Sequence, residues 1–207
     1  MTTKLASIIS YVFHPLMMST FLFLILSIAS PYTILPVGFT KTGAVVLIIL
    51  LWVTTFIIPS LSLFILKKTG SISSLSLNNR KERITPMIYT TVMYGVTTYM
   101  FSTKVELGVM ISVFLGISTL LIALTTLITL FWKISVHGMG IGGLIGLLIA
   151  SNLMEDIVQF DSILVVLFIL AGIVLSARLK LNAHTPTQVY FGFLMGVFVS
   201  FVAYTLY

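Results

Sequence analysis

Long apolar stretches fill most of the chain, and short polar stretches separate them. A membrane-spanning helix needs about 17 to 25 predominantly apolar residues, because the hydrocarbon core of a bilayer is about 30 Å thick. By that requirement the pattern predicts seven helical spans, of which the fifth is barely long enough to cross. The predicted spans are Leu5–Ser30, Gly43–Leu66, Pro86–Phe101, Glu106–Trp132, Gly138–Ser151, Phe160–Ser176 and Pro186–Tyr207.

Composition supports the same class of protein. Hydrophobic residues make up 58% of the chain and charged residues 8%, and the mean hydropathy is +1.18. A soluble domain needs a polar face on each element, whereas these segments are apolar all round. We therefore expect an all-α polytopic membrane helix bundle of six to seven transmembrane helices, forming a single integral membrane domain over residues 1–207. The absence of cysteine excludes a disulfide framework and a thiolate nucleophile.

Three polar islands interrupt the apolar pattern, and each lies at or just before the start of a predicted span. They contain all three arginines of the chain and two of its three histidines. The positive charge is spread between apolar spans and forms no continuous solvated face, which argues against nucleic acid as a partner. The islands are Arg80–Pro86, Lys133–Gly140 and Arg178–Gln188.

The number of spans between the islands predicts where they lie. Two predicted spans separate the first island from the second, and two more separate the second from the third. If each pair crosses completely, all three islands share one side of the membrane with Lys4. The acidic residues Glu155, Asp156 and Asp161 then fall on the other side, and Glu82 is the only acidic residue within the islands.

Each island also carries a helix-start signal. Thr85-Pro86, Ser135 and Thr185-Pro186 place a capping hydroxyl or a first-turn proline before a span. A helix N-terminus offers unpaired N–H groups and roughly half a positive charge. Three converging N-termini with arginine and lysine side chains would form a site suited to an anion such as phosphate.

The second and third islands resemble two parts of the signature of the type 2 phosphatidic acid phosphatase superfamily, a family of membrane lipid phosphatases. The family's third part, S-R-x5-H-x3-D, matches Arg178 and His184 in spacing, with Ala177 and Gln188 in place of serine and aspartate. Its second part, P-S-G-H, matches Ser135 and His137 within the sequence Ile134-Ser135-Val136-His137.

The first island matches the family's K-x6-R-P part only as a basic cluster, Arg80-Lys81-Glu82-Arg83, shortly before Pro86. The three parts nevertheless occur in the family's order, over about residues 80–196. The chain thus resembles a divergent member of this superfamily.

The resemblance implies a phosphatase that acts without metal or cofactor on a lipid phosphate, such as a polyprenyl diphosphate or phosphatidic acid. His184 would attack phosphorus and form a phosphohistidine, and His137 would protonate the departing lipid oxygen. Arg178 would stabilise the charge that grows on the phosphate oxygens. The other implied site residues are Arg83, Lys81, Arg80 and Ser135 as phosphate-binding groups, and Gln188 and Glu82 as orienting groups.

Other interpretations of the same residues stay open. Thr185-Pro186-Thr187-Gln188 fits a capping box, which favours a structural role for Gln188. An uncharged residue at this position also suits a catalytically degenerate member that binds anionic lipid or supports a membrane complex without turnover. The Arg80–Arg83 cluster is typical of a membrane-flanking anchor. His14 is interpreted as a hydrogen-bonded helix residue. The glycines repeated every fourth residue, at 138, 142, 146, 192 and 196, indicate close helix packing.

A multi-pass protein of the cell membrane is expected in either orientation, and two arguments disagree on the face that bears the islands. The positive-inside rule places this lysine- and arginine-rich side in the cytoplasm, whereas the family resemblance implies an extracytoplasmic site. The side that carries the islands holds Lys4, Lys67, Lys68, Arg80, Lys81, Arg83, Lys133, Arg178 and Lys180, against Lys41 and Lys104 opposite.

Overall fold

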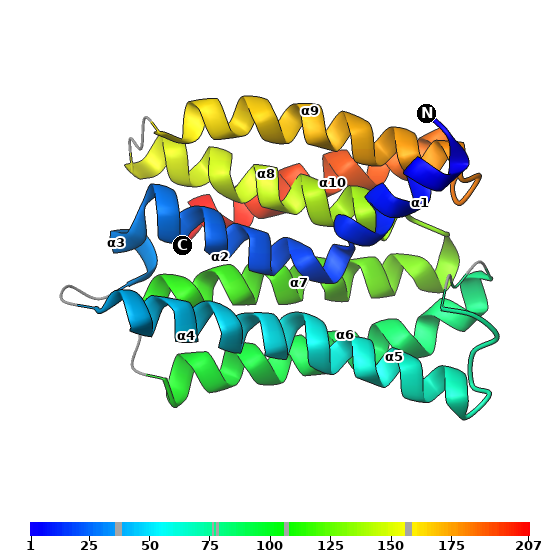
Figure 1. Cartoon of the computed structure of the whole chain (residues 1–207), viewed down its shortest axis with the longest axis horizontal. Helices are drawn as coiled ribbons and strands as arrows, with labels where there is room; N and C mark the ends of the chain where they lie inside the picture. The colour runs from blue at the N-terminus through cyan, green and yellow to red at the C-terminus, as the bar shows by residue number, and fades with distance from the viewer. Residues whose placement is uncertain (36–38, 76, 78, 106–107, 156–158) are drawn as a thin grey trace. The chain divides into compact units, whose positions relative to one another are not determined.

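The computed structural model describes residues 1–207 except 36–38, 76, 78, 106–107 and 156–158, and all regular structure in the described part of the chain is helical (Figure 1). Within the described residues, six helical segments are long and apolar enough to cross a membrane. The predicted all-α membrane bundle is therefore confirmed. Contacts group the helices into two compact units, Met1–Met18 with Lys133–Tyr207 as unit 1 and Ser19–Trp132 as unit 2.

Unit 1 contains α1 (Thr3–Val12), the 3₁₀ turn η1 (Pro15–Met17), α8 (Val136–Glu155), α9 (Gln159–Lys180) and α10 (Pro186–Thr205). Unit 2 contains α2 (Met18–Ala29, whose first residue belongs to unit 1), α3 (Pro31–Ile34), α4 (Lys41–Trp52), the π-helical turn η2 (Val53–Ile57), α5 (Ile58–Lys68), α6 (Arg80–Thr103) and α7 (Val109–Phe131). Glu106, where the fourth span was predicted to start, lies outside the described residues. Asp156 and the side chain of Glu155, which belong to the predicted acidic cluster, lie outside them as well.

The first predicted span is interrupted between α1 and α2. His14 has extended backbone angles, φ −62° and ψ 141°, because the ring of Pro15 disfavours helical geometry in the residue before it. The prediction of a helical His14 is therefore wrong. Its Nδ1 instead accepts a hydrogen bond from the Leu16 N–H at 3.3 Å, so His14 caps the short turn that follows.

The third predicted span begins earlier than expected. The sequence predicts a helix start at Thr85-Pro86, but α6 begins at Arg80 and Pro86 lies inside it. Asn79 caps this start by accepting a hydrogen bond from the Lys81 N–H at 3.1 Å. Pro86 is the seventh residue of α6, so its missing N–H leaves the Glu82 carbonyl without the hydrogen bond that an interior helix residue would donate to it. The first island thus forms the first two turns of a helix.

Helix α6 lies antiparallel to α7 along its length. The hydroxyl groups of Thr91 and Thr126 lie 3.0 Å apart, and those of Thr98 and Thr119 lie 2.9 Å apart. A helix of 24 residues is about 36 Å long, which exceeds the hydrocarbon thickness. Its threonines lower the hydropathy, yet their hydroxyls are satisfied within this pair of helices. Helix α6 is therefore long enough to cross a membrane, but among the described residues it is not one of the six segments that are also apolar enough.

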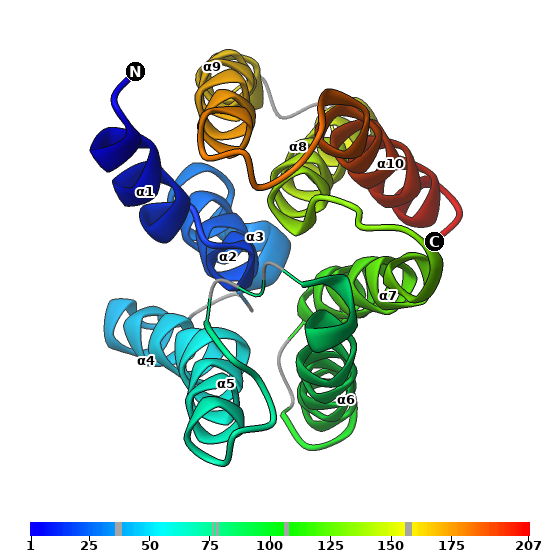
Figure 2. The same cartoon turned by 90° about the vertical axis from the view of Figure 1, so that its right-hand side faces the viewer.

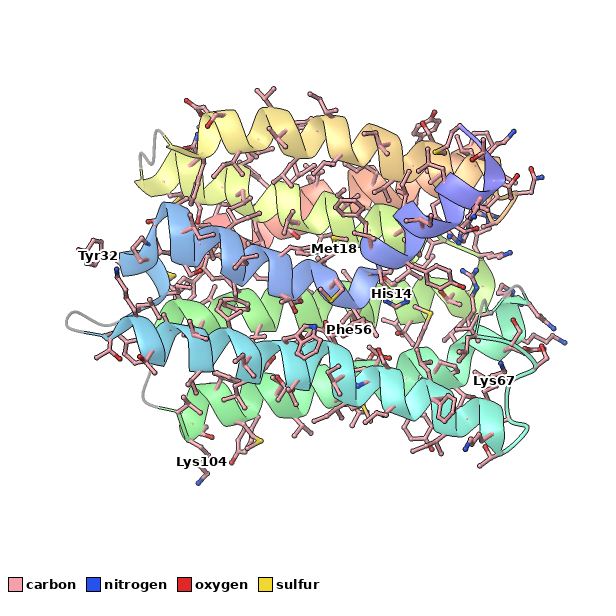
Figure 3. The ribbon with its side chains drawn as sticks, in the orientation of Figure 1. His14, Met18, Tyr32, Phe56, Lys67 and Lys104 are labelled. Carbon is pink, nitrogen blue, oxygen red and sulfur yellow. The ribbon has the colours of Figure 1, made fainter. Side chains whose placement is uncertain are left out.

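Unit 2 contains a buried hydrogen bond at the π-helical turn. A π turn leaves backbone carbonyls in irregular positions, which need other donors when they are buried. The hydroxyl of Tyr94 in α6 donates to the Thr55 carbonyl at 3.0 Å, and Tyr94 is 1% exposed. This bond ties α6 to η2. Figure 3 shows Lys67, near the end of α5, and Lys104, after α6, at opposite ends of the unit.

Glycines bring α8 and α10 into backbone contact in unit 1, where Figure 2 shows the two helices side by side. A Cβ at Gly138 would lie 2.7 Å from the Val189 carbonyl oxygen, and one at Gly192 would lie 2.7 Å from that of Ser135. The glycines at 142, 146 and 196 meet the opposite backbone still more closely. The predicted packing role of these glycines is confirmed, and it holds the starts of two helices together.

Candidate functional site

The second and third islands meet at one end of unit 1. Helices α8 and α10 begin there, α9 ends there, and the Ser135 N–H donates to the Gln188 carbonyl at 3.2 Å. The two islands therefore lie at the same end of unit 1, as the number of spans between them predicts, and their side of the membrane stays a prediction. Asp161 lies near the other end of α9, about 25 Å along the helix from Arg178 at 1.5 Å per residue, and it binds Asn152 at 2.7 Å.

The start of α10 determines which nitrogen of His184 carries the proton. Gln188 Oε1 accepts the Thr185 N–H at 3.2 Å and lies 3.2 Å from His184 Nδ1. Since the backbone N–H can only donate, the amide atom that faces it is the oxygen, and His184 Nδ1 must be the second donor. The neutral imidazole then has its lone pair on Nε2. Gln188 thus closes the predicted capping box and orients His184 at the same time.

His137 is fixed by the N-terminal segment. Its Nε2 lies 3.1 Å from the Ser10 carbonyl oxygen. A carbonyl only accepts, so Nε2 carries a proton and Nδ1 is the nitrogen that can exchange one. His137 is the second residue of α8, and the Ser135 hydroxyl caps that helix by accepting the Gly138 N–H at 3.3 Å. The predicted capping role of Ser135 is therefore confirmed.

Arg178 supplies the positive charge of this cluster. It lies in the last turn of α9, and its Nε is buried without a hydrogen-bond partner among the described residues. His137 lies close enough to Arg178, His184 and His14 for their charges to act on it, and His14 lies similarly close to Arg178. A buried guanidinium N–H without a partner is costly, and the imidazoles of His14 and His137 near it supply no negative charge. The arrangement favours an anion as ligand.

His14 belongs to the same cluster, although its sequence position did not indicate this. Its ring meets that of His137 edge to face, with centroids 5.9 Å apart and planes at 76°. Figure 3 shows His14 where α1 gives way to the following turn. The sequence offered one indication of this position: the pair His14-Pro15 predicts a helix break near the end of the first span that was expected to share a side with the islands.

The first island lies in unit 2, where some of its side chains have structural partners. Arg80 donates from one guanidinium nitrogen to the carbonyls of Thr129, at 2.9 Å, and Leu130 at the end of α7. Arg83 is 5% exposed, and its Nε donates to the Leu77 carbonyl at 2.6 Å. Positive side chains at the C-terminus of a helix stabilise its unpaired carbonyls. The phosphate-binding role of these arginines stays a prediction.

Glu82 and Lys81 complete that island. Glu82 accepts from the Ser73 hydroxyl at 2.7 Å and from the Ser73 N–H at 3.0 Å. These hydrogen bonds stabilise the charged form and lower the pKa of Glu82 below its ordinary value. The Glu82 carboxylate therefore holds Ser73, in the loop before α6, against the start of that helix. Its role as an orienting group for His184 stays a prediction. Lys81 is exposed.

In the described residues, no three histidine, cysteine, aspartate or glutamate side chains gather as metal ligands. Comparisons with protein-family models, with curated proteins and with solved structures give no match.

Proposed function

We propose that unit 1 carries the catalytic site of a membrane phosphatase that hydrolyses a phosphomonoester or diphosphate of a lipid. The observation that carries this proposal is the His184 tautomer, with Nδ1–H held by Gln188 and the lone pair on Nε2, in a cluster that also contains Arg178 and His137. A histidine nucleophile needs this tautomer, because the attacking nitrogen must be unprotonated.

The first half of the reaction transfers the phosphoryl group to the enzyme. His184 Nε2 attacks phosphorus, the bond from phosphorus to the bridging oxygen breaks, and His137 donates a proton to the departing lipid oxygen. Because Nε2–H of His137 is bound to a carbonyl, the transferred proton comes from Nδ1 of the imidazolium form. Arg178 neutralises the phosphate oxygens as their charge grows.

The second half returns the enzyme to its starting state. Water attacks the phosphohistidine, His137 Nδ1 takes a proton from that water, and the bond between phosphorus and His184 breaks to release phosphate. The resemblance adds Ser135, Arg83, Lys81 and Arg80 as further phosphate contacts. The cluster stands at helix ends, so a lipid could present its headgroup there while its tail stays among apolar helices.

Binding of an anionic lipid without turnover is the alternative, and the state of Gln188 favours it. Its amide oxygen is shared between the Thr185 N–H and the imidazole. Unlike the family's aspartate, a neutral amide cannot stabilise the positive imidazole that attack produces. In serine proteases the comparable change from aspartate to asparagine costs about 10⁴ in turnover, because the histidine then adopts the wrong tautomer.

Phosphate release by the purified protein from a panel of lipid phosphates tests both functions. The panel contains phosphatidic acid, a polyprenyl phosphate and a polyprenyl diphosphate. We expect His184→Ala and Arg178→Ala to abolish release, while Lys180→Ala, an exposed change in the same turn of α9, retains it. Turnover that survives both substitutions would eliminate the mechanism. Saturable binding of these lipids without release would establish the alternative.

A chemical trap adds direct evidence for the covalent step. Brief incubation with a lipid labelled in its phosphate should leave label on the protein that is stable to base and lost in acid, as a phosphohistidine is. The His184→Ala variant should take up none. Label retained by that variant would place the nucleophile elsewhere.

A further inference from the structure

The N-terminal segment contacts His137, a residue of the cluster, through the Ser10 carbonyl and through the His14 ring. The Ser10 carbonyl, at the end of α1, accepts the proton of His137 Nε2 at 3.1 Å. Four residues later, the His14 ring lies edge to face against the His137 ring, with 5.9 Å between centroids. Both contacts join parts of the chain that lie more than a hundred residues apart in the sequence.

We propose that His14 is a positioning residue of the site, whose ring holds His137 in the orientation from which it protonates the departing lipid oxygen. This inference rests on the proposed function. Two local features hold His14 in place. Its Nδ1 accepts the Leu16 N–H, and Pro15 favours the extended backbone conformation that His14 adopts.

Two contacts are needed to fix an imidazole. The bond to the Ser10 carbonyl anchors one nitrogen of His137 but leaves the ring able to rotate about that bond. An aromatic edge against the ring removes this freedom. The same two contacts leave Nδ1 as the nitrogen that exchanges a proton, so the N-terminal segment determines both the tautomer of His137 and the direction in which it acts.

A purely structural role for His14 is the competing explanation. The Leu16 N–H needs an acceptor at the start of η1, and His14 supplies it. Asparagine keeps such a capping acceptor and removes the ring, whereas phenylalanine keeps an aromatic ring and removes the acceptor. His14→Asn and His14→Phe therefore separate the two roles. Tyr11→Ala, a change at an exposed position of α1, is the control for the segment.

The substrate pair is chosen to isolate proton donation. One lipid phosphate has the ordinary bridging oxygen, and its analogue has sulfur in that position. A thiolate leaves without a proton, since thiols have pKa values of about 8.5 and lie far below alcohols. Loss of a well-placed general acid costs about 10²–10⁴ in rate, and this cost applies to the oxygen ester alone.

We expect His14→Asn to lower turnover of the oxygen ester by about 10²-fold, the size of effect caused by a misplacement of about 1 Å, and to change that of the sulfur ester little. His14→Phe should recover at least about tenfold of the loss on the oxygen ester, because the ring contact persists. Wild-type turnover in His14→Asn, or an equal loss on both esters, would refute the proposal.

A second measurement does not depend on turnover. In protein labelled with ¹⁵N-histidine, the His137 ring signals, assigned with His137→Gln, should show Nε2 protonated and Nδ1 unprotonated. They should shift or broaden in His14→Asn and return towards the wild-type signals in His14→Phe. Unchanged His137 signals in His14→Asn would contradict the positioning role even if no lipid is hydrolysed. If His184→Ala abolishes release while the His14 variants match the Tyr11→Ala control, this inference fails and the proposed function stands.

Discussion

Replacement of Gly192 by alanine should force α8 and α10 apart at the level of the site. The new Cβ would lie 2.7 Å from the Ser135 carbonyl oxygen and 3.4 Å from Ile134 Cγ1. Ordinary contact begins at 3.4 Å, so the Cβ and the oxygen must separate by a further 0.7 Å or so. The carbonyl has little freedom to move, because it accepts the Met139 N–H at 3.0 Å in the first turn of α8.

The energetic cost follows from two opposing terms. Overpacking of this kind costs about 1–3 kcal/mol, while alanine in place of glycine within a helix returns about 0.5–1 kcal/mol. Gly172→Ala in α9 is the matched control, since its Cβ would meet nothing within 4 Å. The propensity gain occurs in both variants, so the difference between them isolates the clash at about 1–3 kcal/mol.

Thermal unfolding of both variants in the same detergent measures that difference. At roughly 2–4 °C per kcal/mol for a chain of this size, Gly192→Ala should unfold several degrees below Gly172→Ala. Lipid phosphate turnover should fall by about tenfold or more in Gly192→Ala, because a displacement approaching 1 Å between catalytic groups costs up to 10²-fold. Equal unfolding temperatures for the two variants would refute the backbone contact between the helices.

Three further outcomes are expected. Gln188→Glu keeps the shared acceptor and adds a negative charge that stabilises a positive His184 imidazole, so phosphate release should rise. Gln188→Leu removes the acceptor and should lower phosphate release. A fall in both variants would contradict the orienting role of Gln188. Tyr94→Phe leaves the buried Thr55 carbonyl without its donor and should cost about 1–3 kcal/mol by thermal unfolding, whereas the exposed change Tyr99→Phe should cost little. The lowered pKa of Glu82 means that its stabilising bonds are present above the ordinary carboxyl range and are lost as pH falls through the lowered value. Proteolysis of residues 69–79 should therefore accelerate at low pH, and Glu82→Gln should remove most of that pH dependence.

Local patterns were sufficient for much of the fold. The length of each apolar stretch predicted the spans, because a helix must satisfy its own backbone in lipid and must match the thickness of the bilayer. The hydroxyl and proline before α10 predicted its capping box, which the structure confirms. The start of α6 was missed because Pro86 carries a strong N-terminal signal, whereas Asn79 and the charged turn after it form a better cap further upstream.

The candidate site was predictable only in part. The spacing of Arg178 and His184 and the parity of the spans placed two islands at one end, and these residues do gather within unit 1. The sequence predicted two separate roles for Gln188, either capping α10 or orienting His184, because each pattern implies a different hydrogen bond for its side chain. The structure shows that one amide oxygen accepts both bonds.

By itself, therefore, the sequence determined the membrane class, the approximate extent of the six apolar spans found in the described residues, and the end of unit 1 to which His137, Arg178 and His184 belong. Only the tertiary structure decided that His14 and the Ser10 carbonyl join them, and which ring nitrogen of His137 carries a proton. The physical reason lies in the range of the interactions. Hydropathy and capping act within one chain segment, whereas the state of the His137 imidazole depends on the acceptor that another helix places beside it.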